Sequence, residues 1–332
     1  MLQRRWHQWL DQFGLGVAGI DALPQLAMLA IPVGLLSGGV IVLLRLLVES
    51  GAALYMPGGD GENYEALALA VRLLLPAAGG LVIGLVWQNL QDETRQVGIV
   101  HVMERLAYHQ GNLPLRNSIA QFFGISLCIL CGHSVGREGP GAHLGAASGS
   151  QLSRWLHLPN NSRRTLAACG IAAAIAASFN TPLAGVIFAL EVVVMEYTIA
   201  SFIPVVLAAA SATLVSIAAF GNAPAFTIQP LTLTSLTDVP MVIVLGLIAG
   251  ALATLMILLV KFVAGHAKQL EMWQRMLIAG FVMLPFAWLL PQTMGVGYDT
   301  VNLLFGGETL LQLALLLVLG KLLATSAVIG LG

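Results

Sequence analysis

Residues 132–150 read GHSVGREGPGAHLGAASGS, and this stretch decides how the rest of the chain is interpreted. It contains Arg137, Glu138 and His143 among glycines, and strongly apolar segments lie on both sides of it. A stretch this polar does not cross a bilayer by itself. Irregular backbone at membrane depth is tolerated only where it is buried in protein or lines a water-filled cavity. We therefore expect the functional site in residues 132–150.

The composition indicates that the apolar segments on both sides of residues 132–150 lie in a membrane. Of 332 residues, only 9% are charged and 58% are hydrophobic, whereas ordinary soluble domains have about 25% charged residues. The formal net charge is −1 and no basic block is present, so the electrostatic footprint of a nucleic-acid-binding protein is missing. We expect an all-α protein that crosses the cell inner or plasma membrane several times and contacts membrane lipid.

Apolar segments long enough to cross about 30 Å of hydrocarbon recur along the chain. Residues 1–24 predict an amphipathic helix and lead-in, and residues 25–220 a first transmembrane repeat with the functional site. The Pro-, Thr- and Ser-rich residues 221–239 predict a linker, and residues 240–332 a partial second repeat. The expected apolar helices lie at about 25–49, 67–88, 116–132, 165–178, 182–196, 200–220, 239–262, 275–291 and 308–330.

The residues of the central stretch predict an anion site. Gly136 and Gly139 let backbone N–H groups come close to a ligand, and Pro140 suits the first turn of a helix, where a missing N–H costs nothing. A helix N-terminus attracts negative charge. An anion held only by backbone dipoles can leave again, as conduction requires. Glu138 can occupy such a site when ionised and leave it when protonated, so it is the candidate gate.

Three motifs resemble the CLC family of chloride channels and transporters. GREGP at 136–140 is similar to the family's gating motif, and FNTPLAGVIFALE at 179–191 is similar to its second signature. Gly320, Lys321 and Thr325 resemble its GKxxxT pattern. The resemblance implies a homodimer in which each subunit has its own pathway for chloride or a similar anion. It also implies two inverted repeats of tilted and broken helices, with Glu138 as the gating glutamate.

Two departures from the family pattern bear on the function. Val97 stands where a serine hydroxyl usually contacts the anion, which puts the anion preference in doubt, although the backbone of Gly98 and Ile99 can still contribute. Val192 follows Glu191 where proton-coupled members commonly have an acid. We therefore favour passive or gated conduction over proton-coupled antiport. In the antiport alternative, Glu191 or Glu196 relays the protons. The candidate anion-binding residues are Val97, Gly98, Ile99, Gly136, Arg137, Glu138, Gly139 and Pro140.

The sequence stops at Gly332, where family members continue into a further anion-binding segment. We expect the second repeat to be incomplete, and a non-conducting truncated fragment is an alternative to a working pathway. A remote alternative is an intramembrane serine protease built on Ser148. Cys128 and Cys131 form a CxxC without a second ligand pair, and His101 and His109 lie eight residues apart in an amphipathic segment. We expect no enzyme activity, no metal and no cofactor.

Overall fold

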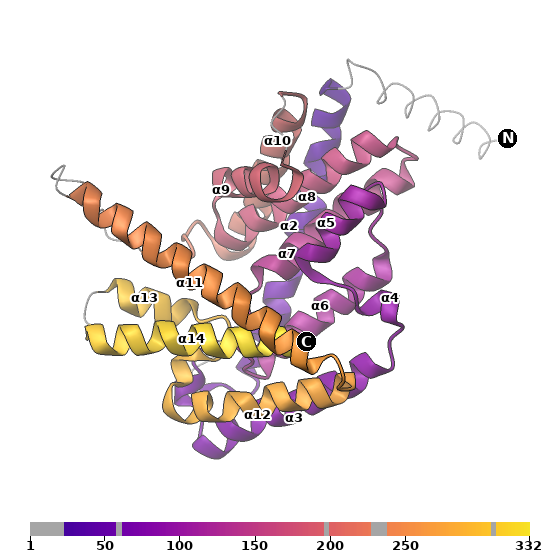
Figure 1. Cartoon of the computed structure of the whole chain (residues 1–332). Helices are drawn as coiled ribbons and strands as arrows, with labels where there is room; N and C mark the ends of the chain where they lie inside the picture. Colours follow the sequence, from indigo (N-terminus) through magenta and orange to yellow (C-terminus); the bar gives the residue numbers. More distant parts are fainter. Residues whose placement is uncertain (1–22, 58–61, 196–198, 227–237, 307–309) are drawn as a thin grey trace. The chain divides into compact units, whose positions relative to one another are not determined.

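The computed structural model describes residues 23–57, 62–195, 199–226, 238–306 and 310–332. Helices joined by turns and short connections make up these residues, and none of them lies in a strand (Figure 1). The amphipathic helix expected near the N-terminus lies outside the described residues. The α-helices are α2 (Leu23–Ala53), α3 (Leu69–Gln88), α4 (Asp92–Arg95), α5 (Gly98–Tyr108), α6 (Leu115–Leu130), α7 (Glu138–Trp155), α8 (Asn160–Phe179), α9 (Pro182–Ile187), α10 (Ile199–Phe220), α11 (Asp238–Ala267), α12 (Met272–Leu289), α13 (Tyr298–Phe305) and α14 (Leu311–Leu331). Short helices of other types are η2 (Tyr64–Ala66), η3 (Phe188–Val194) and η4 (Pro291–Thr293).

Six of the described helices are long and apolar enough to cross a membrane: α2, α3, α10, α11, α12 and α14. α6 and the α9–η3 segment are shorter apolar helices. These helices occupy the segments that the apolar runs predict, so the expectation of a multi-pass all-α membrane protein is confirmed. Proline lies inside several of them, as membrane helices allow, because neighbouring groups satisfy the freed backbone.

The contacts divide the chain into two compact units. The first comprises the described residues within 1–47, 91–125 and 137–225, and the second those within 48–90, 126–136 and 226–332. Each unit therefore draws on separate parts of the sequence. These units are defined by contacts, whereas the two predicted repeats on either side of 221–239 would be related by symmetry. The units therefore do not test the repeats, which stay a prediction.

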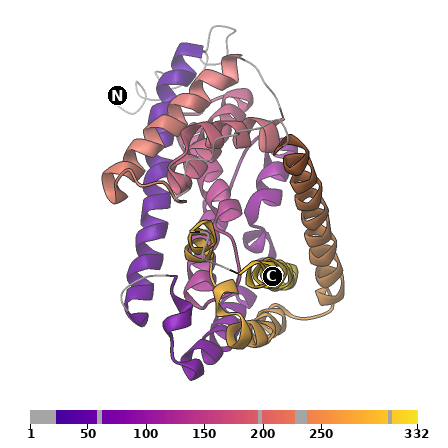
Figure 2. The ribbon, with the colours of Figure 1, turned by 90° about the vertical axis from the view of Figure 1, so that its left-hand side faces the viewer.

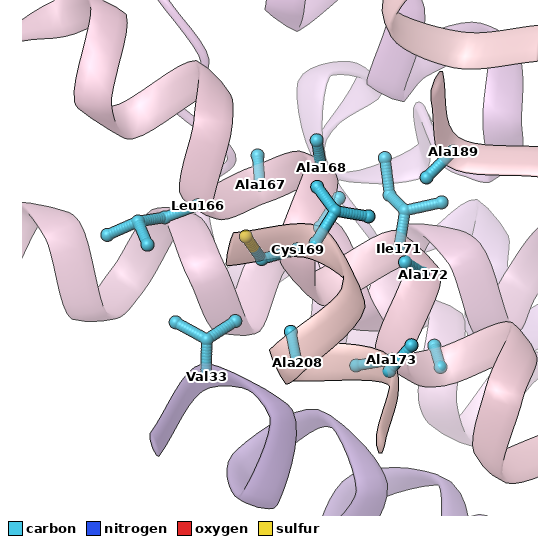
Figure 3. Packing of buried hydrophobic residues seen from close by; sticks show 14 of the residues in the cluster. Val33, Leu166, Ala167, Ala168, Cys169, Ile171, Ala172, Ala173, Ala189 and Ala208 are labelled. Atoms are coloured by element: carbon cyan, nitrogen blue, oxygen red, sulfur yellow. The ribbon is translucent and has the colours of Figure 1, made fainter. Parts of the chain in front are cut away.

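The core of the first unit forms around α8, which is rich in alanine and buried along most of its length. Figure 3 shows Cys169 and its neighbours on α8 close to Val33 of α2, Ala208 of α10 and Ala189 of η3. Small side chains let these backbones approach closely, and close van der Waals packing is what associates helices in a membrane. α8 is therefore the central element of the first unit.

Glycines hold α7 against α8. A Cβ atom on Gly145 would lie 2.1 Å from the carbonyl oxygen of Gly170, and one on Gly149 would lie 2.0 Å from that of Leu166. Both distances are far shorter than van der Waals contact, so only glycine fits at this crossing. The crossing fixes the position of α7, whose first residue is Glu138.

In the second unit, α3 and α12 run side by side and meet at Gly80 and Gly280 (Figure 1). α14 packs on α11, an unbroken helix of 30 residues (Figure 2), and on α12. The Lys321 ammonium on α14 donates hydrogen bonds to the carbonyl oxygens of Thr293, at 3.0 Å, and Gly295, at 2.7 Å. This lysine of the GKxxxT pattern therefore binds one backbone carbonyl at the end of η4 and one just after it.

Tyrosines also anchor the end of α6. The hydroxyls of Tyr55 and Tyr64 donate to the carbonyl oxygens of Leu130 and Ile129, respectively. These two carbonyls belong to the last turn of α6, where helix carbonyls have no partner within the helix. Burial raises the pKa of Tyr55 to about 12, so this hydroxyl keeps its proton and remains a donor at any physiological pH.

Candidate functional site

The GREGP residues lead into α7 and form its first turn. Arg137 is the N-cap, Glu138 the first helical residue, and Gly139 and Pro140 follow. Gly136 to Pro140 are all partly exposed. The backbone N–H groups of a first helical turn have no partner within the helix, and proline has no N–H to leave unpaired. Glu138 therefore stands at a helix end that favours negative charge.

The Arg137 side chain contacts the C-terminal end of α8. Its Nη2 atom donates to the carbonyl oxygen of Ser178 on the last turn of α8, at 3.4 Å. A positive charge is favourable at a helix C-terminus, where carbonyl oxygens point outward. This contact joins the start of α7 to the end of α8.

The second candidate segment forms the start of α5. Val97 is its N-cap, with extended backbone and no side-chain hydrogen bond to the helix, and Gly98 follows at φ +84°. A positive φ of this kind favours glycine. Ile99 packs against the core of the first unit. Gly98 is therefore needed for the turn by which the chain enters α5.

A residue that the sequence analysis did not single out holds this turn in place. Asn117, on α6, is buried, and its Nδ2 atom donates to the carbonyl oxygens of Glu93, at 2.6 Å, and Gln96, at 2.7 Å. Both carbonyls lie in the connection that leads to Val97. An amide side chain in the first turn of an apolar helix was the available sequence signal, because polar groups in such helices usually have a specific partner.

α5 and α7 contact one another near their starts. The rings of His101 on α5 and His143 on α7 have their centroids 5.6 Å apart. His101 is three residues after Gly98, and His143 is five residues after Glu138. At 1.5 Å per residue, both helix starts lie within about 8 Å of this contact, measured along each axis. The structure thus brings the two candidate segments, 97–99 and 137–140, to neighbouring helix ends of one unit.

The FNTPLAG signature forms a different element. α8 ends at Asn180, which has a left-handed backbone with φ 58°, and Pro182 starts α9. α9 continues into the π-helix η3, a rare geometry that is frequent at functional sites. Glu191 and Val192 lie on η3 and are exposed, with Val192 at 46%. Glu196, the other candidate for a proton path, lies outside the described residues.

The residues on which the serine-protease and metal-site alternatives rest do not form such sites among the described residues. The Ser148 hydroxyl donates to the carbonyl oxygen of Leu144 on its own helix, at 3.0 Å, rather than to an imidazole. Cys128 and Cys131 are free cysteines. Throughout the described residues, no three His, Cys, Asp or Glu side chains are grouped in a way that could hold a metal ion.

Comparison with known proteins identifies similar sequences over most of the chain. A ClcB-like chloride channel protein of Ralstonia nicotianae is 31% identical over 274 residues, which cover 81% of this chain and 64% of that protein. The voltage-gated ClC-type chloride channel ClcB of Escherichia coli is 30% identical over 267 residues, which cover 79% of this chain and 63% of that protein. The chain thus spans a little less than two thirds of the length of these relatives.

Solved structures show the same fold. A CLC-type fluoride/proton antiporter matches with a TM-score of 0.78 at 24% identity, over 93% of this chain and 77% of the other. A slow cyanobacterial Cl⁻/H⁺ antiporter matches with a TM-score of 0.75 at 20% identity, over 93% of this chain and 75% of the other. The family model for the voltage gated chloride channel matches residues 79–332. With its GREGP turn at the start of α7, the chain therefore belongs to the voltage-gated chloride channel (CLC) family.

Proposed function

We propose that the chain forms a gated pathway for chloride or a similar small anion, with Glu138 as the gate. One observation carries this proposal: Glu138 is the first residue of α7, at the helix end where an anion is favoured. The ionised carboxylate competes with a permeant anion for the same backbone N–H groups. When the carboxyl group is protonated, it loses the charge that holds it there, and the anion takes its place.

The anion site of this proposal consists of two helix starts. The start of α7 contributes Gly136, Arg137, Glu138, Gly139 and Pro140, and the start of α5 contributes Val97, Gly98 and Ile99. The contact between His101 and His143 supports their grouping, because it joins α5 to α7 close to both starts. Binding by backbone dipoles suits transport, because an anion must bind and also leave.

The relatives support chloride as the substrate, since both are named as chloride channels. We further propose that the protein acts as a homodimer in which each subunit has its own pathway, as the family resemblance implies. In this role the chain is a membrane transport protein rather than an enzyme. It uses its own helix ends and one carboxylate, with no cofactor.

Chloride flux from liposomes containing Glu138→Gln tests the gate. Glutamine mimics the protonated side chain, so we expect faster flux at neutral pH. A rise of roughly tenfold would correspond to about 1.4 kcal/mol of competition between carboxylate and anion. Flux through the wild-type protein should rise as the pH falls, because protonation removes the competing charge, and the variant should lose this dependence.

The matched control is Glu104→Gln, which removes an exposed carboxylate from α5. We expect wild-type flux and wild-type pH dependence from this control. Unchanged flux and unchanged pH dependence in Glu138→Gln would show that the gate is elsewhere. A wild-type protein that is folded in liposomes and passes no anion would contradict conduction itself and favour the non-conducting alternative.

Proton-coupled antiport is the second candidate. Both solved structures described above are antiporters, and Glu191 offers one carboxylate on η3. Against it stands Val192, which has no group that can bind a proton. We therefore rank passive conduction first, and the two candidates differ in whether chloride movement drives proton movement.

A further inference from the structure

His101 and His143 form a pair of buried imidazoles with no role in the proposed gate. His101 is 5% exposed and His143 is 0% exposed. Their rings lie 5.6 Å apart between centroids and are tilted by 53°. Their chain neighbours Val102 and Ala142 belong to the apolar core of the first unit. Two polar side chains from different helices are thus enclosed together near the starts of α5 and α7.

None of the four ring nitrogens has a hydrogen-bond partner among the described residues. Buried polar side-chain atoms nearly always have one, and a buried donor or acceptor without a partner costs about 1–3 kcal/mol. A tilted pair of rings at this separation is also a common aromatic contact. That contact uses only the ring faces and edges, however, and leaves the nitrogens unsatisfied. A ligand that binds imidazole nitrogens would remove the cost.

The separation of the rings suits a shared metal ion. Zinc lies about 2.0–2.1 Å from a histidine nitrogen in tetrahedral sites, so two rings that share one cation have centres on the order of 5–6 Å apart. Only the neutral imidazole has a lone pair for the metal. The 5.6 Å separation of the ring centroids therefore allows both histidines to bind one cation.

We propose that His101 and His143 together bind one divalent transition-metal cation of the zinc type, which then links α5 to α7. The described residues offer no third protein ligand there, so water or a small anion completes the coordination. This proposal goes beyond the gate, because it assigns a metal site to residues outside the anion-binding segments. A bound cation would restrain the two helices that start at Gly98 and Glu138.

Metal titration of the purified full chain, with any histidine tag removed, tests the site. Isothermal titration with ZnCl₂ should show one binding site per chain. CoCl₂ should produce the visible absorption of a nitrogen-ligated cobalt ion. His101→Gln and His143→Gln should each weaken binding at least tenfold. Glutamine keeps a polar side chain of similar length, which limits the risk of misfolding.

The matched control is His109→Ala, which removes an exposed imidazole just past the end of α5. It should bind zinc as the wild type does. Zinc should also raise the thermal unfolding temperature of the wild type and of this control, but not of the two glutamine variants. Equal zinc affinity in wild type and glutamine variants would overturn the proposal, as would a wild type that binds no zinc. These readouts need no anion flux, so they succeed or fail independently of the gate.

Discussion

At the scale of single residues, Val97 is the member of the proposed anion site whose side chain departs from the family pattern. It is the N-cap of α5, and its side chain makes no hydrogen bond to the helix. Serine, threonine, asparagine and aspartate are preferred at this position because their oxygen accepts from the first N–H groups. Valine leaves those N–H groups to other acceptors but contributes no hydroxyl donor of its own.

We predict that Val97→Ser increases the preference for chloride over nitrate. The added hydroxyl can donate one hydrogen bond to the bound anion. A hydrogen bond is worth about 1 kcal/mol net, which corresponds to a rise of roughly fivefold in the permeability ratio. Fluxes of the two anions from the same liposome preparation measure this ratio. Val97→Ala is the control, because it shortens the side chain without adding a hydroxyl, and it should leave the ratio unchanged. Identical ratios in all three proteins would show that position 97 does not contact the anion.

Local sequence signals predict the position of some single residues in the structure but not the contacts of others. The position of Glu138 at a helix start could be predicted, because Gly139, Pro140 and the following small residues are local signals. The contact partner of His101 could not be predicted from the sequence. The sequence places His109 eight residues further along the same amphipathic segment, but His109 is exposed, and the ring beside His101 belongs to His143. That pairing depends on how α5 and α7 cross, which no local pattern specifies.

At the scale of elements, the α7–α8 crossing holds Glu138, the proposed gate, in position. Gly145 and Gly149 lie one helical turn apart on α7, and α8 presents the carbonyl oxygens of Gly170 and Leu166 to them. In a membrane, such small residues provide the close packing that associates helices. The crossing therefore controls where the first turn of α7 lies.

We predict that Gly145→Ala destabilises the protein. Its Cβ atom would lie 2.1 Å from the Gly170 carbonyl oxygen and 2.7 Å from the Ala174 Cβ atom, so α7 and α8 must separate. Overpacking of this kind typically costs about 1–3 kcal/mol, and the thermal unfolding temperature in detergent should fall accordingly.

The matched control for this crossing is Gly246→Ala on α11, where a Cβ atom meets nothing within 4 Å. Alanine is the better helix former by about 1 kcal/mol, so the unfolding temperature of this variant should stay level or rise. Equal effects of the two substitutions would mean that the α7–α8 crossing is not tightly packed.

The helices themselves could largely be predicted from apolar runs, and their exceptions have physical causes. The expected helix at 165–178 is longer in the structure, where α8 begins at Asn160. Its first turns are polar, so an apolar run does not include them. The π-helix after Ile187 was not predicted either. It differs from an α-helix by its hydrogen-bond register, and the spacing of apolar residues does not encode that difference.

At the scale of the whole molecule, the chain has two compact units made from interleaved segments. α3 and α12 pack together although about two hundred residues separate them in the sequence. Pairings of this kind arise from the close fit of particular surfaces, such as Gly80 against the backbone of Met276. Composition predicts a linker at 221–239, but it does not reveal which distant helices share a core.

Whether proton movement accompanies anion movement is also a property of the whole molecule. Coupling requires a continuous route of groups that can bind protons between the gate and the far side of the membrane. Glu138 supplies one such group and Glu191 another, but the residue after Glu191 is Val192, which is 46% exposed on η3. A hydrocarbon side chain can neither accept nor donate a proton, so the route lacks its expected acid at that position.

We predict that an outward chloride gradient across liposomes containing the wild-type protein moves chloride but drives no protons against their own gradient. A chloride electrode and a pH-sensitive dye inside the same liposomes measure the two fluxes together. A proton ionophore serves as the control, because it must collapse any pH difference that the protein generates. Uphill proton movement in a fixed ratio to chloride would contradict passive conduction. If Glu191→Gln then abolished the proton flux and kept the chloride flux, Glu191 would be the proton-bearing group despite the valine beside it, and the protein would be an antiporter.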